Sequence, residues 1–177
     1  MGKTTKIRAM HAEDLAAVLE IQSCCYDAAK LESRESFLAK LEASPATCFI
    51  AVVAGFQVGY LVAIPAEEGS PPSLNEPTYV PPRAANALYL HDLAVHPEAR
   101  GSGAAAALVA AYFHALTQSQ ARFGCLTAVN QSSAYWERHG FRSASVADVK
   151  AGCMVTYGEG AQYMSVQVSV RGSSGSR

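Results

Sequence analysis

The sequence predicts a single mixed α/β domain, and three observations carry this prediction. The chain has 177 residues, the length of an ordinary single domain. Half of its residues are hydrophobic and 16% are charged, which is enough apolar material for a buried core. Runs rich in β-forming residues alternate with runs of helical period, without an internal repeat or a change of composition. We expect one domain over residues 1–170 and a flexible tail over residues 171–177.

The first half of the chain predicts two helices and a hairpin. Leu15, Val18 and Leu19 recur at helical spacing, and Pro45 ends a second helical run. Two β-rich runs follow, separated by three residues that begin with Gly55. The elements expected here are strands over residues 5–8, 48–54 and 58–65 and helices over residues 12–25 and 33–43.

A long proline-rich loop separates the two halves of the chain. Residues 65–82 hold six of the eight prolines, and loops of such length are usually functional or mobile. After the loop come the clearest strand of the sequence and an alanine-rich helix with a single apolar stripe. The elements expected here are strands over residues 88–95, 123–129, 143–149 and 162–170 and helices over residues 102–118 and 132–139.

The charge balance and the cysteines exclude several classes of protein. Lys+Arg 14 against Asp+Glu 15 gives a net charge of -1, which lacks the basic surplus of a nucleic-acid or membrane-surface binder. No apolar run reaches the ~18–20 residues of a membrane helix, and no signal-peptide pattern is present. Five cysteines without a C-x-x-C pair argue against a disulfide framework and a structural zinc. We expect a cytoplasmic protein without metal; edge strands near the C-terminus could pair two copies into a homodimer.

Residues 89–103, YLHDLAVHPEARGSG, carry the strongest functional signal. A strand ends near Val95, and a glycine-bearing loop then opens directly into a helix. Gly101 and Gly103 permit a close approach of the backbone, the first helical turn presents free N–H groups, and Arg100 adds positive charge. This combination predicts an anion site, most naturally for a pyrophosphate.

Three other interpretations of this loop have less support in the sequence. Gly101, Gly103 and Ala106 formally fit the dinucleotide-binding fingerprint, but polar residues separate the loop from its strand and no acidic residue ends the next strand. A Walker loop is excluded because no Gly-Lys-Ser/Thr follows. Taken alone, the loop could also be a plain Gly-Ser turn before an ordinary helix.

The sequence around the loop resembles one superfamily. Residues 100–105, RGSGAA, resemble the R/Q-x-x-G-x-G/A signature of the GNAT superfamily of acetyl-CoA-dependent N-acetyltransferases. The flanks DLAVHPEARG and NQSSAYWERHGF resemble it too, and the order of elements does so over residues 5–149. The resemblance implies a mostly antiparallel sheet of about six or seven strands, splayed at the fourth and fifth, with about four flanking helices. It also implies acetyl transfer from acetyl-CoA to a primary amine by direct attack in a ternary complex.

By this resemblance, the loop and the splayed strand hold the cosubstrate. The loop binds the CoA pyrophosphate, the exposed backbone of the strand pairs with the pantetheine, and a backbone N–H near Leu93 or Ala94 stabilises the tetrahedral oxyanion. The expected acetyl-CoA contacts are Leu93, Ala94, Val95, Arg100, Gly101, Ser102, Gly103, Ala104, Ala105, Asn130 and Trp136.

The expected base lies on the strand before the loop. YLHDLAVH resembles the arylalkylamine branch, whose strand presents two histidines, two residues apart, to the acceptor amine; His91 matches the second, and Tyr89 stands at the first. A protonated amine cannot attack a thioester, and histidine titrates in the right range to take its proton. We therefore expect His91 to be the general base. Strand alternation places Tyr89, Leu93 and Val95 on its face, and Asp92, the alternative base, on the opposite face.

The expected general acid is Tyr135. The family uses a tyrosine in the pattern F-Y-x-K/R-x-G-F to protonate the CoA thiolate, but residues 135–141 read YWERHGF and Trp136 stands at that position. An indole cannot serve as this acid. Tyr135 is adjacent, about 100° further round a helix, and the interval from Asn130 is one residue short, which could correct the offset. A covalent route through Cys125 is disfavoured because no basic partner is evident.

The sequence favours a small primary amine as acceptor, framed by residues 24–31 and 67–87. A peptide N-terminus or a lysine is the alternative acceptor. A non-catalytic acyl-CoA-binding domain of the same fold is the alternative function, favoured by Trp136 and disfavoured by His91. The side chains that could form an aromatic wall or attract an ammonium are Tyr26, Tyr60, Tyr79, Tyr89, Asp27, Glu67 and Glu68.

Overall fold

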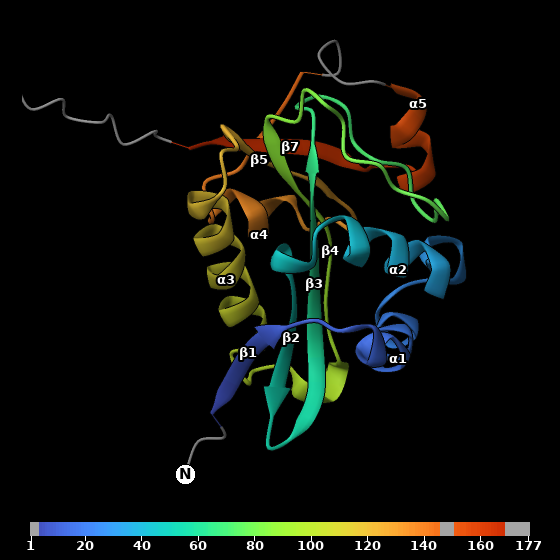
Figure 1. Ribbon diagram of the computed structural model, residues 1–177, viewed down its shortest axis with the longest axis vertical. Helices are drawn as coiled ribbons and strands as arrows, with labels where there is room; N and C mark the ends of the chain where they lie inside the picture. Colours follow the sequence, from blue (N-terminus) through green and yellow to red (C-terminus); the bar gives the residue numbers. More distant parts are fainter. Residues whose placement is uncertain (1–3, 146–150, 169–177) are drawn as a thin grey trace, which may run out of the picture.

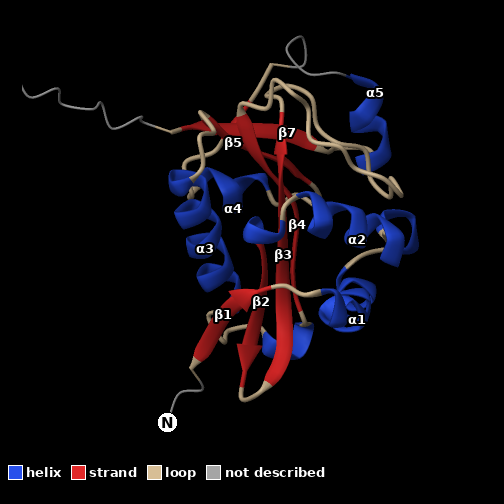
Figure 2. Cartoon of the chain, in the orientation of Figure 1, coloured by secondary structure: helices blue, strands red, loops and turns tan. Residues whose placement is uncertain are grey.

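The protein is built on one sheet, described here from a computed structural model that covers residues 4–145 and 151–168. The strands are β1 (Thr5–Ala9), β2 (Cys48–Val53), β3 (Phe56–Ala66), β4 (Ala87–Val95), β5 (Phe123–Ala128), β6 (Arg142–Ser143) and β7 (Gln162–Gln167). Their order in the sheet is β1-β2-β3-β4-β5-β7-β6; Figures 1 and 2 label all of these strands except β6. Every neighbouring pair is antiparallel except β4 and β5, which are parallel.

Helices cover both faces of the sheet (Figure 1). One apolar cluster joins the sheet to α1 and α2, and a second cluster joins the opposite face to α3 and α4. The helical elements used below are α1 (Leu15–Cys25), η2 (Ala28–Lys30), α2 (Arg34–Ala43), α3 (Ala104–Gln118), α4 (Ser133–Glu137), α5 (Ala151–Met154) and η6 (Val155–Tyr157).

The expected mixed α/β fold, with the fourth and fifth strands as its point of splaying, is confirmed. Most of the expected elements are present within a few residues of their predicted bounds. The prediction of a strand over residues 143–149 is wrong for residues 144 and 145, because β6 contains only Arg142 and Ser143. Residues 146–150 lie outside the described part of the chain, and so does the tail expected over residues 171–177. The segments α5 and η6 were not expected, because a four-residue helix has no readable period.

An extra residue interrupts the pairing of β4 with β3. Val62 lies opposite Asp92, and the next residue of β3, Ala63, lies opposite Leu90, so His91 is left without a partner in this ladder. A bulge of this kind shifts the alternation of side chains by one residue, so that the residues after it change face.

The bulge overturns the expected arrangement of side chains on β4. Tyr89 packs in the cluster of α1 and α2, whereas Leu93 and Val95 pack against the cluster of α3. Asp92 accepts hydrogen bonds from tyrosines on the α1 side, and His91 contacts Tyr89 there. The prediction that Leu93 and Val95 share the face of His91, with Asp92 opposite, is therefore wrong.

The two parallel strands separate next to this bulge. Their pairing runs from Ala87 and Phe123 to Leu90 and Leu126 and ends there, whereas β4 continues to Val95. His96 donates its backbone N–H to Val58 of β3, so by antiparallel alternation the backbone groups of Leu93 and Val95 face away from β3, toward the gap.

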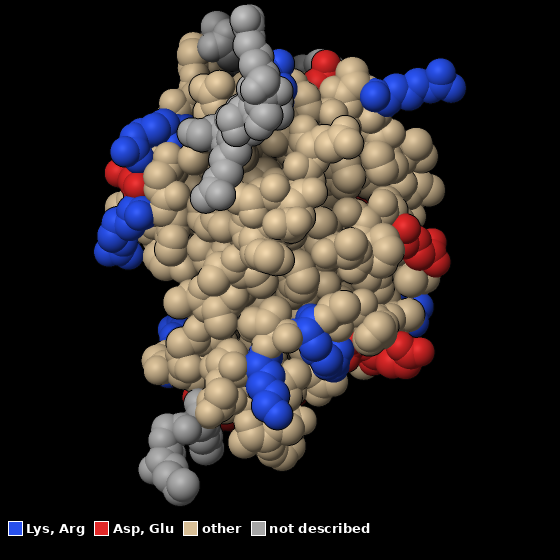
Figure 3. All heavy atoms as spheres, turned by 60° about the vertical axis from the view of Figure 1, so that its left-hand side comes forward, with Lys and Arg blue, Asp and Glu red and all other residues tan. Residues whose placement is uncertain are grey.

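Charge is scattered over the face of the molecule shown in Figure 3, where Lys and Arg side chains are separated by uncharged surface. Among the described residues, no helix combines the length and the apolar character needed to cross a membrane.

We predict that Gly124→Ala destabilises the junction of β5 with α3. A Cβ at Gly124 would lie 2.7 Å from the Tyr112 hydroxyl oxygen, which donates to the Leu88 carbonyl, and 2.8 Å from a methyl carbon of Leu116. We expect a loss of about 1–3 kcal/mol in the free energy of unfolding, measured by urea denaturation. Gly152→Ala, where a Cβ meets nothing within 4 Å, is the control. Equal effects of the two substitutions would contradict this packing.

Candidate active site

A pocket of about 230 Å³ opens where β4 and β5 separate. Its lining comes from segments far apart in the sequence: the end of α1 and η2, the long β3–β4 loop, β4, β5, α4 and η6. Among the residues that line the pocket are Tyr26, Lys30, Glu32, Leu74, His91, Asp92, Leu93, Thr127, Tyr135, Trp136 and Tyr157.

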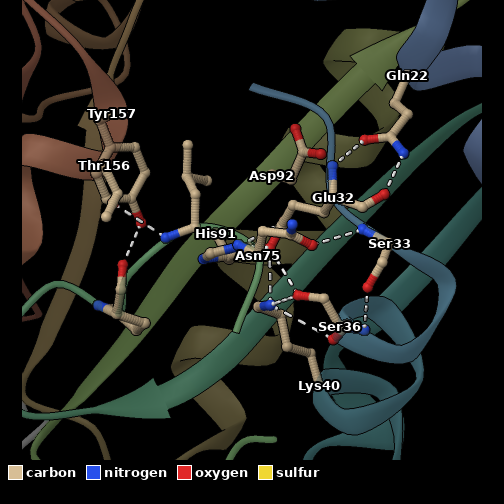
Figure 4. Close-up of polar contacts among 12 residues, drawn as sticks. Gln22, Glu32, Ser33, Ser36, Lys40, Asn75, His91, Asp92, Thr156 and Tyr157 are labelled. Atoms are coloured by element: carbon tan, nitrogen blue, oxygen red, sulfur yellow. Dashed lines mark hydrogen bonds and ion pairs between the residues drawn. The ribbon is translucent and has the colours of Figure 1, made fainter. Parts of the chain in front are cut away.

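His91 is held by a carboxylate at one side of this pocket. Its Nε2 lies 2.7 Å from Oε1 of Glu32, and both side chains are almost fully buried (Figure 4). The other ring nitrogen, Nδ1, is buried and has no hydrogen-bond partner among the described residues. An ionised carboxylate can only accept, so Nε2 carries the hydrogen, and in a neutral ring the lone pair then lies on Nδ1.

Glu32 is ionised because donors surround its second oxygen. Oε2 accepts from Lys40 Nζ at 2.8 Å, from Ser36 Oγ at 2.8 Å and from the backbone N–H of Asn75 at 2.7 Å. Burial opposes ionisation of Glu32, but the hydrogen bonds from His91 and Lys40 and the positive charge of Lys40 outweigh it and hold the pKa of this carboxyl well below its usual range.

The bulge directs Asp92 into a cage of two tyrosines. The Tyr26 hydroxyl donates to Oδ1 at 2.8 Å, and the Tyr60 hydroxyl donates to Oδ2 at 2.6 Å. Burial raises the pKa of Asp92, although both hydrogen bonds work in the opposite direction. Since both of its oxygens are engaged, Asp92 holds β4 to α1 and is a poorer candidate for the base than His91.

Tyr157 forms a second wall of the pocket, and sequence reasoning did not identify it. Its hydroxyl accepts from Tyr89 at 3.0 Å and donates to the Pro72 carbonyl at 2.5 Å. Tyr89 also shares a 2.6 Å hydrogen bond with Thr127. Tyr89, which stands where the arylalkylamine branch was expected to present a first histidine, is thus a buried side chain of β4 that is hydrogen-bonded to β5 and η6.

The long loop after β3 closes over this side of the pocket. Leu74 lines the pocket, and its backbone N–H donates to Thr156 Oγ1 at 3.0 Å. Asn75 contacts Glu32, and its side-chain oxygen accepts from the Ser33 N–H at 2.7 Å. Figure 4 shows these contacts meeting around His91 from both sides.

Tyr135 and Trp136 both reach the pocket from α4. Trp136 is 8% exposed, and its ring packs edge-on to Tyr135 and Phe141. Burial raises the pKa of Tyr135, with Arg138 acting against it. The structure therefore brings the two expected catalytic side chains, His91 and Tyr135, to the same pocket, although they come from opposite sides of the gap.

The residues expected to hold acetyl-CoA are spread along a path from this pocket to the start of α3. Leu93 lines the pocket, whereas Ala94 and Ala104 are buried. The carbonyl of Leu93 accepts from Tyr26 and that of Val95 from Cys25 Sγ, but a carbonyl oxygen has a second lone pair for a ligand.

The glycine loop lies at the far end of this path. Gly103 is the N-cap of α3 at φ 83, and Gly101 adopts φ 80, a region that favours glycine. Arg100, Gly101 and Ser102 line a separate hollow beside α1, and Ala105 is half-buried in the first turn of α3. Backbone of this shape at the N-terminus of a 15-residue helix fits a pyrophosphate.

Asn130 links the end of β5 to η2 across the gap between β4 and β5. It follows β5 with φ 51, and its Oδ1 accepts from Lys30 of η2 at 3.1 Å. Cys125 lies within the sheet, where burial raises the pKa of its thiol to about 12, which disfavours a covalent acyl intermediate.

Comparison with known proteins agrees with the fold expected from the sequence. A family model described as the acetyltransferase (GNAT) family matches residues 15–141. No curated protein matches the chain. Nothing in these comparisons specifically supports the arylalkylamine branch.

Solved structures match over nearly the whole chain. Ard1 from Thermoplasma volcanium has 15% identity and a TM-score of 0.69, covering 94% of this chain and 99% of its own. Naa50 from Arabidopsis thaliana, in complex with the bisubstrate analogue CoA-Ac-MVNAL, has 12% identity and a TM-score of 0.65, covering 93% and 99%. The yncA protein from Salmonella typhimurium, with acetyl-CoA bound, has 17% identity and a TM-score of 0.64, covering 95% and 96%. At these identities the likeness concerns the fold.

We predict that Glu32 contributes to stability against acid. Its folded-state pKa is depressed, so its contribution is present above the unfolded pKa of about 4.3 and is lost as pH falls below it. In urea denaturation between pH 7 and pH 3, the double variant Glu32→Gln/Lys40→Met should lose less unfolding free energy than the wild type. Asp14, with a pKa lowered to about 2 by Arg8, contributes equally in both proteins.

Glu35→Gln, which removes an exposed carboxylate from the start of α2, three residues after Glu32, is the matched control and should follow the wild type. An identical pH dependence of the double variant and the wild type would show that the pKa of Glu32 is not depressed.

Proposed function

Because the chain belongs to the GNAT family of acetyltransferases, we propose that it moves the acetyl group of acetyl-CoA directly to a small primary amine in the pocket between β4 and β5. Acetyl-CoA is the cosubstrate. The observation that carries this proposal is the meeting of His91 and Tyr135 at one pocket, with Nδ1 of His91 unpaired and buried.

The proposed reaction uses these two side chains in sequence. The amine nitrogen attacks the acetyl carbon while its proton passes to Nδ1 of His91. The tetrahedral oxyanion is stabilised by a backbone N–H near Leu93 or Ala94. The carbon–sulfur bond then breaks, and the CoA thiolate takes a proton from the hydroxyl of Tyr135. The imidazolium releases its proton to solvent and the phenolate regains one, so the sum is amide plus free CoA.

The cosubstrate would lie along the free edge of β4. In this proposal its pantetheine pairs with backbone groups of Leu93, Ala94 and Val95, beside Asn130 and Trp136, and its pyrophosphate reaches the loop before α3. The loop residues in this role are Arg100, Gly101, Ser102, Gly103, Ala104 and Ala105. The positive φ angles of the loop and the orientation of the strand's backbone support this path.

The closed acceptor side supports a small amine. The pocket of about 230 Å³ has to hold the acetyl end of the thioester as well as the acceptor. Leu74 and Tyr157 wall it, and the β3–β4 loop is tied down on both sides. Naa50 is similar in fold and binds an analogue with a peptide portion, so a peptide is the acceptor to test against.

A non-catalytic acyl-CoA-binding domain is the second candidate function. The observation that favours it is Trp136, which stands where the family's acid tyrosine is expected. The unpaired Nδ1 of His91 favours the enzyme, because a buried imidazole nitrogen without a partner destabilises a protein unless something uses it.

We predict acetyl-CoA-dependent release of CoA with small primary amines. Aryl-alkyl amines, polyamines, amino acids, a lysine peptide and peptides with a free N-terminus would be compared in one thiol assay, with the signal of the protein's five cysteines subtracted. We expect at least one small-amine class to exceed every peptide by about tenfold or more in kcat/KM. Turnover of peptides alone would contradict the small acceptor, and binding of acetyl-CoA without any turnover would favour the second candidate.

We also predict that both catalytic side chains are needed for turnover. His91→Gln should remove the acid limb of the pH–rate profile and lower kcat/KM by about 10²–10⁴-fold, and Tyr135→Phe should lower kcat by a factor in the same range. Acetyl-CoA affinity, measured by calorimetry, should change little. His114→Gln alters an exposed histidine of α3 and is the control. Full activity of either variant would exclude that residue from the mechanism.

A further inference from the structure

We propose that Glu32 and Lys40 are positioning residues which together fix the proton of His91 on Nε2 and keep the ring neutral at rest. This inference rests on the proposed function, in which His91 is the base. It assigns a role to two buried charged residues that neither touch the proposed reacting atoms nor belong to the motif around the glycine loop.

The first argument is the cost of burying these charges. Lys40 is 0% exposed and Glu32 is 4% exposed, and the two form an ion pair at 2.8 Å next to a histidine that is 7% exposed. Desolvating two opposite charges costs several kcal/mol per ion, and well-packed apolar residues of similar size are often as stable. Stability alone is therefore a weak reason for the Glu32–Lys40 ion pair, and its effect on the protonation of His91 is a better one.

The two carboxylate oxygens of Glu32 have different hydrogen-bond partners. Oε2 accepts from Lys40, Ser36 and the Asn75 N–H, which leaves Oε1 for His91. Gln22 fixes the backbone of Glu32 through two hydrogen bonds, of 2.6 and 3.0 Å. A carboxylate held in this way always takes the hydrogen of Nε2, so the lone pair of the neutral ring is always on Nδ1.

The third argument concerns the charge of the ring. Without Lys40, the buried Glu32 carboxylate would face only His91, and a protonated ring would be its natural counter-ion. With Lys40 present, the Glu32–Lys40 pair is already neutral, and a proton on the ring would add an uncompensated buried charge. Lys40 thus keeps His91 free to take a proton, while Glu32 stabilises the imidazolium once it forms.

The other polar groups near His91 are two tyrosines, an aspartate and a lysine. Tyr89 and Tyr157 contact its ring, and both hydroxyls are hydrogen-bonded. Asp92 follows His91 on β4, burial raises its pKa, and Tyr26 and Tyr60 engage both of its oxygens. Lys30 lines the same pocket. Among the described residues, Glu32 and Lys40 are the charged side chains joined to His91 through hydrogen bonds.

The test compares pH profiles of kcat/KM. Lys40→Met should move the acid limb to higher pH by about one unit or more, because the ring becomes the counter-ion of Glu32. The double variant Glu32→Gln/Lys40→Met should move that limb back to lower pH and reduce the maximal kcat/KM by at least about tenfold, since the tautomer is no longer fixed. It also avoids the folding risk of Glu32→Gln alone, which would strand a buried Lys40.

Controls on the exposed side of α2 separate this role from a general effect of charge. Arg34→Met and Glu35→Gln make the same charge changes without contacting the network and should leave the limb in place. An unmoved limb in Lys40→Met would overturn the proposal, and so would full activity of the double variant.

A second readout does not depend on turnover. Long-range ¹H–¹⁵N spectra of the ¹⁵N-histidine protein distinguish the two ring tautomers, and His91→Gln identifies the signal. At a pH above the acid limb of each protein, we expect hydrogen on Nε2 in the wild type and in Lys40→Met, and a mixture of tautomers in the double variant. Hydrogen on Nδ1 in the wild type would overturn the proposal even for an active enzyme. A protein that turns over no amine but shows the expected spectra would refute the proposed function alone.

Discussion

The separation of β4 from β5 determines where everything else at the site can lie. The parallel pairing stops at Leu90 and Leu126, and the next residue of β4, His91, is the extra residue of a bulge against β3. Because the bulge turns the strand by one position, His91 and Asp92 both face α1 and α2 while Leu93 and Val95 face α3. One residue thus ends the pairing, opens the pocket and directs two titratable side chains to the same side.

The polar side chains at the bulge are hydrogen-bonded by segments that are distant from β4 in the sequence. Ser36 and Lys40 stand one turn apart on α2 and approach Glu32 together. The β3–β4 loop contributes the N–H of Asn75 to the same carboxylate, so the loop that walls the pocket is also part of the network that holds His91. Loop position and ring position are therefore coupled through a single carboxylate.

Much of the fold could be predicted because its long elements carry clear patterns, as in the apolar stripe of α3 and the apolar residues of β4 on either side of His91 and Asp92. The bulge at His91 could not be predicted, because it depends on the register against β3 and no residue in YLHDLAVH marks it. Glu32 and Lys40 were missed for a related reason. Lys40 lies on a short helix of mixed composition and Glu32 in the loop before it, where charged residues suggest solvated positions, and only the tertiary contact shows that both are buried.

The charged residues of the pocket affect which protonation form of the acceptor binds. The carboxylates that line the pocket in the described structure are Glu32 and Asp92, and both are saturated by donors from the protein. Asp27, Glu67 and Glu68, which the sequence offered for attracting an ammonium, are not among the lining residues, whereas the cation Lys30 is. A pocket of this kind offers a protonated amine little electrostatic gain, so in the proposed reaction it favours the neutral form of the acceptor. The proton that remains to be removed is the one released as the neutral amine attacks, and this is the proton that the proposal assigns to His91.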